Sequence, residues 1–155
     1  MELRIIPKEE LEKILTLHAR WLKVNKFKDP KISKTMDNKY YLDKSGRVAS
    51  IFNQSGGLRT TPFEPKLRVG TSGYQIVTIN RVNKLLHRVI AQEYIGSVEG
   101  KIVHHIDGNR LNNNLSNLKI TDVSENNKFG AKTRAKNLIK RVNEVYNAFS
   151  EIASN

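Results

Sequence analysis

Hydrophobic residues near the N-terminus recur at the spacing of one helical face. Leu11, Ile14, Leu15, His18 and Leu22 lie three or four positions apart, shortly after a proline that suits a first helical turn. The pattern predicts an amphipathic helix in which His18 packs among apolar side chains, because no second potential metal ligand lies one turn away. Residues 23–38 are polar and basic, which is typical of either an arm along a phosphate backbone or a solvated linker.

Between residues 40 and 80 the pattern changes to short runs of β character. Apolar or alternating segments at 40–42, 48–52 and 74–79 are separated by serine- and glycine-containing turns. They predict a small antiparallel sheet. Basic side chains punctuate these strands, so the sheet is either a DNA-contacting surface or a scaffold with a charged outer face.

Two further helices are expected beyond this sheet. Residues 83–96 place apolar side chains on one side and end at a glycine. His87 lies at the start of this helix, where a structural role is favoured over a catalytic one. Residues 138–152 carry a second apolar stripe at helical spacing, which predicts a C-terminal helix packed against the rest of the chain. The stripe is too short to require a coiled coil.

Residues 101–127 bring together two of the four histidines and a cluster of asparagines, side chains that can bind metals or, for histidine, transfer protons. An apolar lead of strand character runs into His104 and His105, and a tight Asp-Gly-Asn turn follows. A return strand is expected at 118–120, and Ser124-Glu125-Asn126 suits the start of a helix. Strand, turn, strand and helix in so few residues predict a compact ββα unit.

The charge of the chain indicates its partner. The net charge is +12, and basic residues outnumber acidic ones in each third of the sequence. A polyanion, most commonly a nucleic acid, is therefore the expected partner, and a long duplex suits a basic surface distributed in this way; the alternative is a merely basic protein. The candidate DNA contacts are Arg47, Arg59, Lys66, Arg68, Arg88, Lys128, Lys132, Arg134 and Lys136.

Other features exclude several classes of protein. The chain has no cysteine, which excludes disulfides, thiol nucleophiles and cysteine-ligated zinc. Its N-terminus lacks the apolar core of a signal peptide, and no apolar run is long enough to span a bilayer. We therefore expect a cytoplasmic protein that does not bind a membrane. If a phage encodes the protein, the cytoplasm is that of the host cell.

The ββα unit resembles a known family in three segments. Residues 103–109, 117–118 and 124–126 read VHHIDGN, NL and SEN, and together they resemble the HNH endonucleases, in particular phage- and intron-encoded homing members. A His-Arg helix start at His87 and the β-rich stretch YYLDKSGRVAS also resemble segments found upstream in that group. The resemblance covers residues 40–130, approximately.

This resemblance implies metal-dependent hydrolysis of DNA that leaves 5′-phosphate and 3′-hydroxyl ends. It implies that His105 is the general base, and that Asn117 orients or tethers the loop around it. It also implies that His104 and Asn126 bind one divalent metal ion. Mg²⁺ or Mn²⁺ is expected. Ni²⁺ or Zn²⁺ is also compatible, because His104 is a neutral ligand at a position where several relatives have aspartate, and a neutral imidazole shifts the preference toward softer ions.

The sequence therefore predicts an α+β protein with a small antiparallel sheet and a ββα-metal unit, flanked by N- and C-terminal helices. The expected division is an N-terminal helix and basic arm (1–38), a DNA-contacting β region (39–82), the nuclease unit (83–130) and a basic C-terminal helix (131–155). A monomer would nick one strand, whereas a homodimer would cut both.

Two alternatives to a nuclease remain open from the sequence. The chain is then a non-catalytic DNA-binding module with a remnant motif, or the motif is an asparagine-rich scaffold loop. Regular strand alternation places His104 and His105 on opposite faces.

Overall fold

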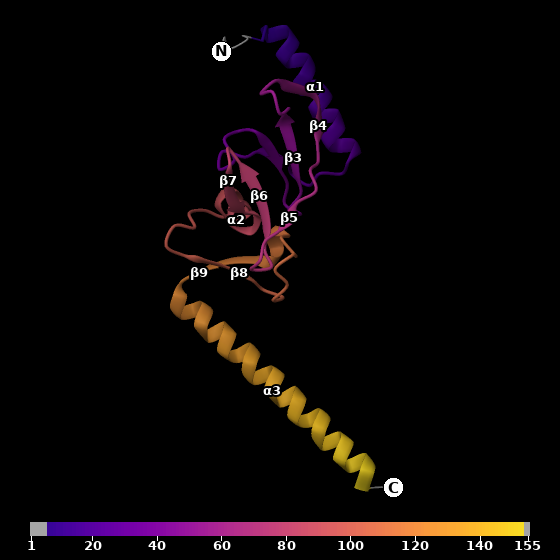
Figure 1. The fold of residues 1–155 in the computed structure, drawn as a ribbon, viewed down its shortest axis with the longest axis vertical. Helices are drawn as coiled ribbons and strands as arrows, with labels where there is room; N and C mark the ends of the chain where they lie inside the picture. Colours follow the sequence, from indigo (N-terminus) through magenta and orange to yellow (C-terminus); the bar gives the residue numbers. More distant parts are fainter. Residues whose placement is uncertain (1–5, 154–155) are drawn as a thin grey trace. The chain divides into compact units, whose positions relative to one another are not determined.

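The structure is a computed structural model that describes residues 6–153. After the first helix, the strands β1 to β7 follow one another before the second helix begins (Figure 1), and this segregation of helices and strands confirms the predicted α+β class. The elements in chain order are α1 (Lys8–Val24), β1 (Lys31–Ile32), β2 (Tyr40–Leu42), β3 (Val48–Phe52), β4 (Leu58–Phe63), β5 (Arg68–Val69), β6 (Gln75–Ile79), β7 (Val82–Leu85), α2 (Leu86–Tyr94), β8 (Ile102–His105), a 3₁₀ turn (Leu115–Asn117), β9 (Leu118–Thr121) and α3 (Val123–Ala153).

The strands form three small sheets. The first has the order β1-β2-β3-β4, the second β5-β6-β7, and the third pairs β8 with β9. The first two are antiparallel throughout, with Tyr41 opposite Ala49 and Ile76 opposite Leu85. Antiparallel neighbours joined by short turns explain how so many strands arise within so short a segment.

The chain divides into two compact units. One comprises the residues up to Glu99 together with Val103–Ile120, and the other comprises Gly100–Ile102 and the chain from Thr121 onward. Each unit is described by itself below. The four-part division expected from the sequence stays a prediction.

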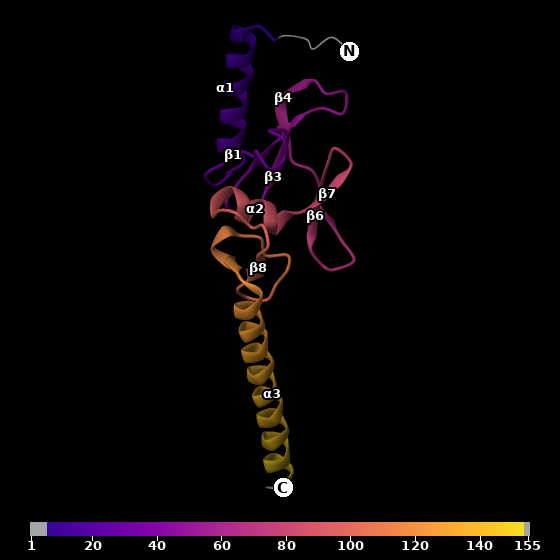
Figure 2. The ribbon, with the colours of Figure 1, turned by 90° about the vertical axis from the view of Figure 1, so that its left-hand side faces the viewer.

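The predicted N-terminal helix is present as α1, which packs along β4 (Figures 1 and 2). His18 is fully buried on its inner face. Its Nδ1 lies 3.0 Å from the Tyr41 hydroxyl, and its Nε2 donates to the Arg59 carbonyl oxygen over 2.7 Å. The expectation that His18 is a packed core histidine is therefore confirmed.

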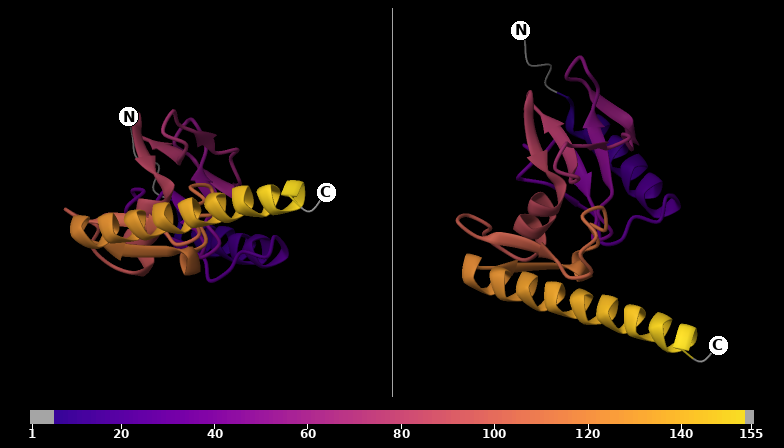
Figure 3. Two further views of the ribbon diagram at one scale, coloured as in Figure 1. Left: turned by 90° about the horizontal axis from the view of Figure 1, so that it is seen from below. Right: turned by 60° about the horizontal axis from the view of Figure 1, so that its bottom comes forward.

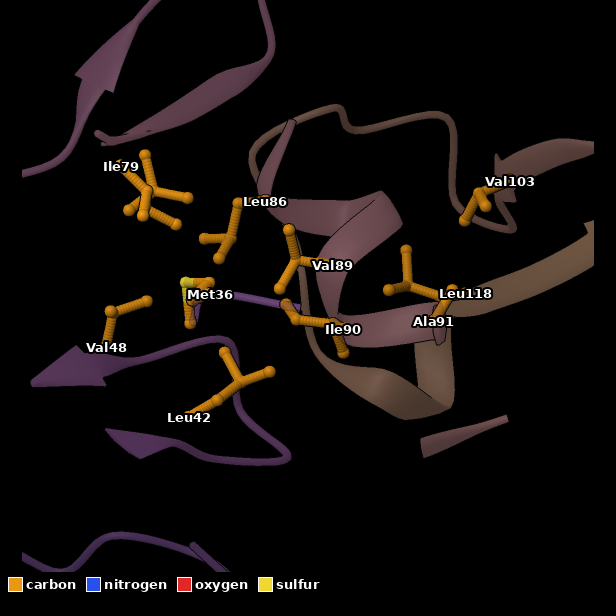
Figure 4. Packing of buried hydrophobic residues seen from close by; sticks show 11 residues of the cluster. Met36, Leu42, Val48, Ile79, Leu86, Val89, Ile90, Ala91, Val103 and Leu118 are labelled. Carbon is orange, nitrogen blue, oxygen red and sulfur yellow. The ribbon is translucent and has the colours of Figure 1, made fainter. Parts of the chain in front are cut away.

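The main hydrophobic core joins the first two sheets, α2, β8 and β9. Figure 4 shows Leu86 and Ile90 of α2 between strand residues such as Leu42 and Leu118. Met36 is completely buried in the same cluster. This position differs from the solvated linker or phosphate-tracking arm considered for residues 23–38. A single buried methionine produces no periodicity, so the sequence carried no signal for it.

The second predicted helix begins later than expected. Residues 83–85 belong to β7, where Val77 pairs with Lys84 and Ile76 with Leu85, and α2 starts at Leu86. Pairing with β6 therefore determines the conformation of these residues, and the apolar spacing could not reveal it.

The third helix, α3, is one continuous element from Val123 to Ala153 (Figure 3). Asp122 caps it, because its Oδ1 accepts from the Glu125 backbone N–H over 2.7 Å. The apolar stripe is exposed: Leu138 is 63% exposed and Phe149 is 69% exposed. The expected packing of this stripe on the chain is therefore wrong for the described structure. No helix in residues 6–153 is both long and apolar enough to cross a membrane.

Candidate active site

The two neighbouring histidines occupy opposite faces of β8. The strand alternates, with Val103 and His105 buried and with Ile102 and His104 partly exposed. This is the alternation that a pleated strand imposes. His105, which is 5% exposed, therefore faces the interior of its unit, and His104 faces away from it.

A buried asparagine holds the imidazole of His105. The Nε2 atom of His105 lies 3.0 Å from Oδ1 of Asn113, whose side chain is itself almost completely buried. The Nδ2 atom of Asn113 donates to Oε1 of Gln75 over 2.7 Å. A chain of two side-chain hydrogen bonds therefore connects His105 to the first residue of β6.

Aromatic rings pack against the same imidazole. Tyr74 stacks on His87 with the ring centroids 4.7 Å apart, and the His87 and His105 centroids are separated by 5.0 Å. The guanidinium of Arg110 lies 4.9 Å from the centre of the Tyr74 ring. These contacts surround His105 with side chains from β6, α2 and the loop after β8.

His87 is neutral at physiological pH. Burial, together with the smaller effects of the neighbouring His105 and Arg88, lowers its pKa to about 4. The buried side-chain polar atoms without a hydrogen-bond partner, within residues 6–153, are His87 Nδ1 and Thr121 Oγ1. The expected structural role of His87 stays a prediction; its buried ring packs against both Tyr74 and His105.

Asn117 ties together the two ends of the polar loop. Its Oδ1 accepts from the Asp107 backbone N–H over 3.0 Å, and its Nδ2 donates to Asp107 Oδ1 and to the Asn112 carbonyl, each over 2.9 Å. Hydrogen bonds from Asn112, the Asn109 backbone and Asn117 lower the pKa of Asp107. The loop conformation is therefore fixed by its own polar side chains.

The loop also docks on the β2–β3 turn. The Leu115 N–H donates to the Lys44 carbonyl over 2.8 Å. Gly46 has a φ of +87°, and a Cβ atom there would lie 2.9 Å from the Asn113 carbonyl oxygen. Only glycine permits both this backbone conformation and this close approach.

The two predicted metal ligands lie in different units. His104 is on β8, whereas Asn126 is in the first turn of α3, where its backbone N–H donates to the Asp122 carbonyl over 3.0 Å. Both are partly exposed. The described residues contain no group of three or more His, Cys, Asp or Glu that could hold a metal.

The predicted DNA contacts fall into two sets with different surroundings. Arg47 makes a bidentate ion pair with Glu64 at 2.8 and 2.6 Å, and Arg59 donates to the Phe52 carbonyl over 3.0 Å. Arg68 and Arg88 also donate to groups of their own unit, and Lys66 is exposed. The other set is exposed on α3: Lys128, Lys132, Arg134 and Lys136.

Sequence reasoning missed Tyr74, Gln75 and Asn113. Gln75 and Asn113 are far apart in the chain, and no motif links them, so only the fold reveals their contact. Asn113 belongs to the asparagine-rich loop that the sequence analysis described. Its two neighbours are also asparagines, so nothing in the sequence distinguished it from them.

Comparison with known proteins identifies the segment that contains this site. Residues 84–128 match the family model described as HNH endonuclease. An uncharacterized HNH endonuclease of Acanthamoeba polyphaga mimivirus is 32% identical over 126 residues, covering 76% of this chain and 36% of the relative. A putative HNH homing endonuclease from the SPbeta prophage of Bacillus subtilis is 47% identical over 45 residues, covering 28% of this chain and 26% of the relative. The chain therefore spans about a third of the length of the mimivirus relative and about a quarter of the length of the prophage relative.

A solved structure shares the fold. It comes from work on DNA binding and cleavage by the HNH homing endonuclease I-HmuI. It matches this chain with a TM-score of 0.53 and 24% sequence identity. The match covers 72% of this chain and 66% of that chain. The resemblance inferred from the sequence is therefore confirmed, and residues 84–128 belong to the HNH endonuclease family.

Proposed function

We propose that this chain is a metal-dependent endonuclease that hydrolyses phosphodiester bonds of double-stranded DNA. The observation that carries this proposal is the state of His105 within the family segment. Its ring is buried, oriented by Asn113 over 3.0 Å and enclosed by two other rings. A general base needs such a fixed orientation, whereas a scaffold or a DNA-binding loop does not.

In the proposed reaction His105 takes a proton from the attacking water. Asn117 holds the loop around it through its hydrogen bonds to Asp107 and Asn112. The neutral state of His87 also matters, because a second imidazolium next to His105 would oppose its protonation during catalysis. The products are a 5′-phosphate and a 3′-hydroxyl.

His104 and Asn126 are the proposed ligands of one divalent cation, Mg²⁺ or Mn²⁺, with Ni²⁺ or Zn²⁺ as alternatives. When bound, the cation supplies positive charge for the developing phosphoryl oxyanion and for the departing alkoxide. The chain itself supplies the base and its orientation. Both ligands are uncharged, so the cation would keep its full charge for the phosphate.

DNA contact is assigned to the basic residues, with the exposed lysines and arginine of α3 as the principal phosphate contacts. The motif occurs once, so one chain would nick one strand, and cleavage of both strands needs a second copy or a second binding event. The proposed place of action is the cytoplasm, which is that of the host cell for a phage gene.

The test compares the wild-type protein with His105→Ala on supercoiled plasmid, with Mg²⁺, Mn²⁺, Ni²⁺, Zn²⁺ or EDTA. Open-circular product from the wild type alone, lost in EDTA, would support a metal-dependent nuclease that uses His105. General-base loss predicts a rate decrease of about 10²–10⁴-fold with DNA binding retained. Equal cleavage by both proteins would contradict the assignment of His105.

A non-catalytic DNA-binding module is the second candidate, and the exposed basic residues of α3 favour it equally. Gel shifts with both proteins, without cleavage in any metal, would support this candidate. A target library with random sites removes the objection that the plasmid lacks a recognition site.

A further inference from the structure

We propose that Gln75, which lies outside the family-matched segment, is a positioning residue that fixes the tautomer of His105 through Asn113. This inference rests on the proposed function, in which His105 is the base. The question is which of the two ring nitrogens of His105 accepts a proton from water. The sequence motif does not settle that question, because either ring nitrogen can act as the base.

Gln75 decides which end of the Asn113 amide faces the histidine. An asparagine side chain ends in an oxygen that only accepts and a nitrogen that only donates. The Nδ2 atom of Asn113 donates to Gln75 Oε1 over 2.7 Å, so Oδ1 is turned toward His105. If Gln75 presented its own nitrogen instead, the Asn113 amide would face the opposite way.

The orientation of Asn113 in turn fixes the proton on His105. Oδ1 lies 3.0 Å from His105 Nε2, and two acceptors cannot share this contact, so Nε2 must carry hydrogen. The neutral ring then has its lone pair on Nδ1. Within residues 6–153, the buried side-chain atoms without a hydrogen-bond partner do not include Nδ1 of His105. We assign this nitrogen to the attacking water.

Three features prevent this network from relaxing. Asn113 and His105 are 4% and 5% exposed, so water cannot readily replace a lost partner. Gly46 contacts the main chain of Asn113, where an added Cβ would lie 2.9 Å from the carbonyl oxygen. The Tyr74 and His87 rings lie against the His105 imidazole, with centroids 5.9 and 5.0 Å from it. The amide and the ring are therefore held in place, and the Gln75 side chain sets their polarity.

The same strand start contributes both parts of this arrangement. Tyr74 packs on the rings, and Gln75, the first residue of β6, begins the hydrogen-bond chain. The family-matched segment starts at residue 84, so it includes neither of them. The HNH motif of this protein is thus incomplete without the second sheet.

The test uses the metal-free protein in EDTA, labelled with ¹⁵N in histidine, at about pH 8, where an ordinary histidine is neutral. Ring ¹⁵N shifts report which nitrogen of His105 carries hydrogen. Gln75→Leu removes the acceptor, whereas Gln75→Glu keeps an acceptor and has no donor. Gln92→Leu is the matched control, because Gln92 also gives a single acceptor contact, to the Val98 N–H over 3.1 Å.

We expect a dominant Nε2–H tautomer in the wild type, in Gln75→Glu and in the Gln92→Leu control. Gln75→Leu is expected to shift the ring ¹⁵N signals toward the averaged values of a mixed tautomer. It is also expected to lower kcat about 10-fold without changing the KM for DNA. If Gln75→Leu does not fold, Gln75→Met provides an unbranched replacement of similar length.

An Nδ1–H tautomer in the wild type would overturn the inference, as would unchanged ring shifts in Gln75→Leu. The NMR readout needs no cleavage, so it separates this inference from the proposed function. Tautomer control with no nuclease activity would support the network and reject the nuclease. Cleavage with an unaltered tautomer would do the reverse.

Discussion

The loop between β8 and β9 and the helix α3 follow each other in the chain, but they are stabilised in opposite ways. In the loop, the side-chain amides of Asn117 and Asn113 form hydrogen bonds within the protein, and both residues are buried. On α3 the side chains from residue 131 to residue 153 are exposed, including an apolar stripe of Leu138, Val142, Val145, Phe149 and Ile152.

This difference separates preorganisation from adaptable contact. A catalytic group must be oriented before the substrate arrives, because reorganisation during the reaction raises the barrier. Long cationic side chains that contact phosphates need only charge and reach, and the partner orders them. The loop has the first property and α3 has the second. The following predictions test this contrast, from the largest expected effect to the smallest.

Truncation of a core leucine and of a stripe leucine should differ most. Leu86→Ala removes a fully buried side chain and should lower the free energy of unfolding by about 2–5 kcal/mol. Leu138→Ala, on the exposed stripe, should change it by less than about 0.5 kcal/mol. Urea unfolding measures both. A large loss from Leu138→Ala would show that the stripe is covered in solution.

The buried His87 should make stability depend on pH. Its pKa is about 4 in the folded protein, below the ordinary histidine value of 6.5, so between these values the unfolded chain binds the extra proton. This stability is complete above pH 6.5 and is lost as the pH falls toward 4, by about 3 kcal/mol. His87→Phe, which keeps the ring stacking, should remove most of this loss in urea titrations. An unchanged pH slope would contradict the neutral state of His87.

Asparagines in the two regions should respond differently to truncation. Asn117→Ala removes three hydrogen bonds and should cost about 2 kcal/mol of stability, with a decrease in cleavage rate of about 30-fold. Asn137→Ala, exposed on α3, should leave both quantities nearly unchanged. Thermal unfolding and plasmid nicking give the two readouts. Equal effects would remove the distinction between a fixed loop and an adaptable helix.

The smallest effect concerns single cations in DNA binding. Lys132→Gln should weaken binding several-fold and reduce the slope of affinity against salt by about 1. Arg47→Gln should change the slope less, because Glu64 already neutralises that guanidinium at 2.6 Å. Fluorescence anisotropy in EDTA at several salt concentrations measures both slopes. A larger change for Arg47→Gln would assign the phosphate contact to the β region.

Much of the fold was predictable from local patterns. The stripe around His18 predicted α1, and the alternation around His104 and His105 predicted β8 with the two rings on opposite faces. These elements follow from periodicity, which is a property of nearby residues. The start of α2 and the burial of Met36 were not predictable, because pairing with β6 and packing in the core determine them.

The sequence by itself determined the HNH motif, the basic character of the chain and the candidate base, because residue types and their spacing carry that information. Only the tertiary structure decided how the side chain of this candidate base is held. Gln75 approaches Asn113 because the second sheet brings β6 against the loop, and Gly46 leaves room for Asn113 because its turn packs there. Hydrogen bonds between residues far apart in the chain have no period in the sequence. The orientation of the His105 ring therefore depends on the fold.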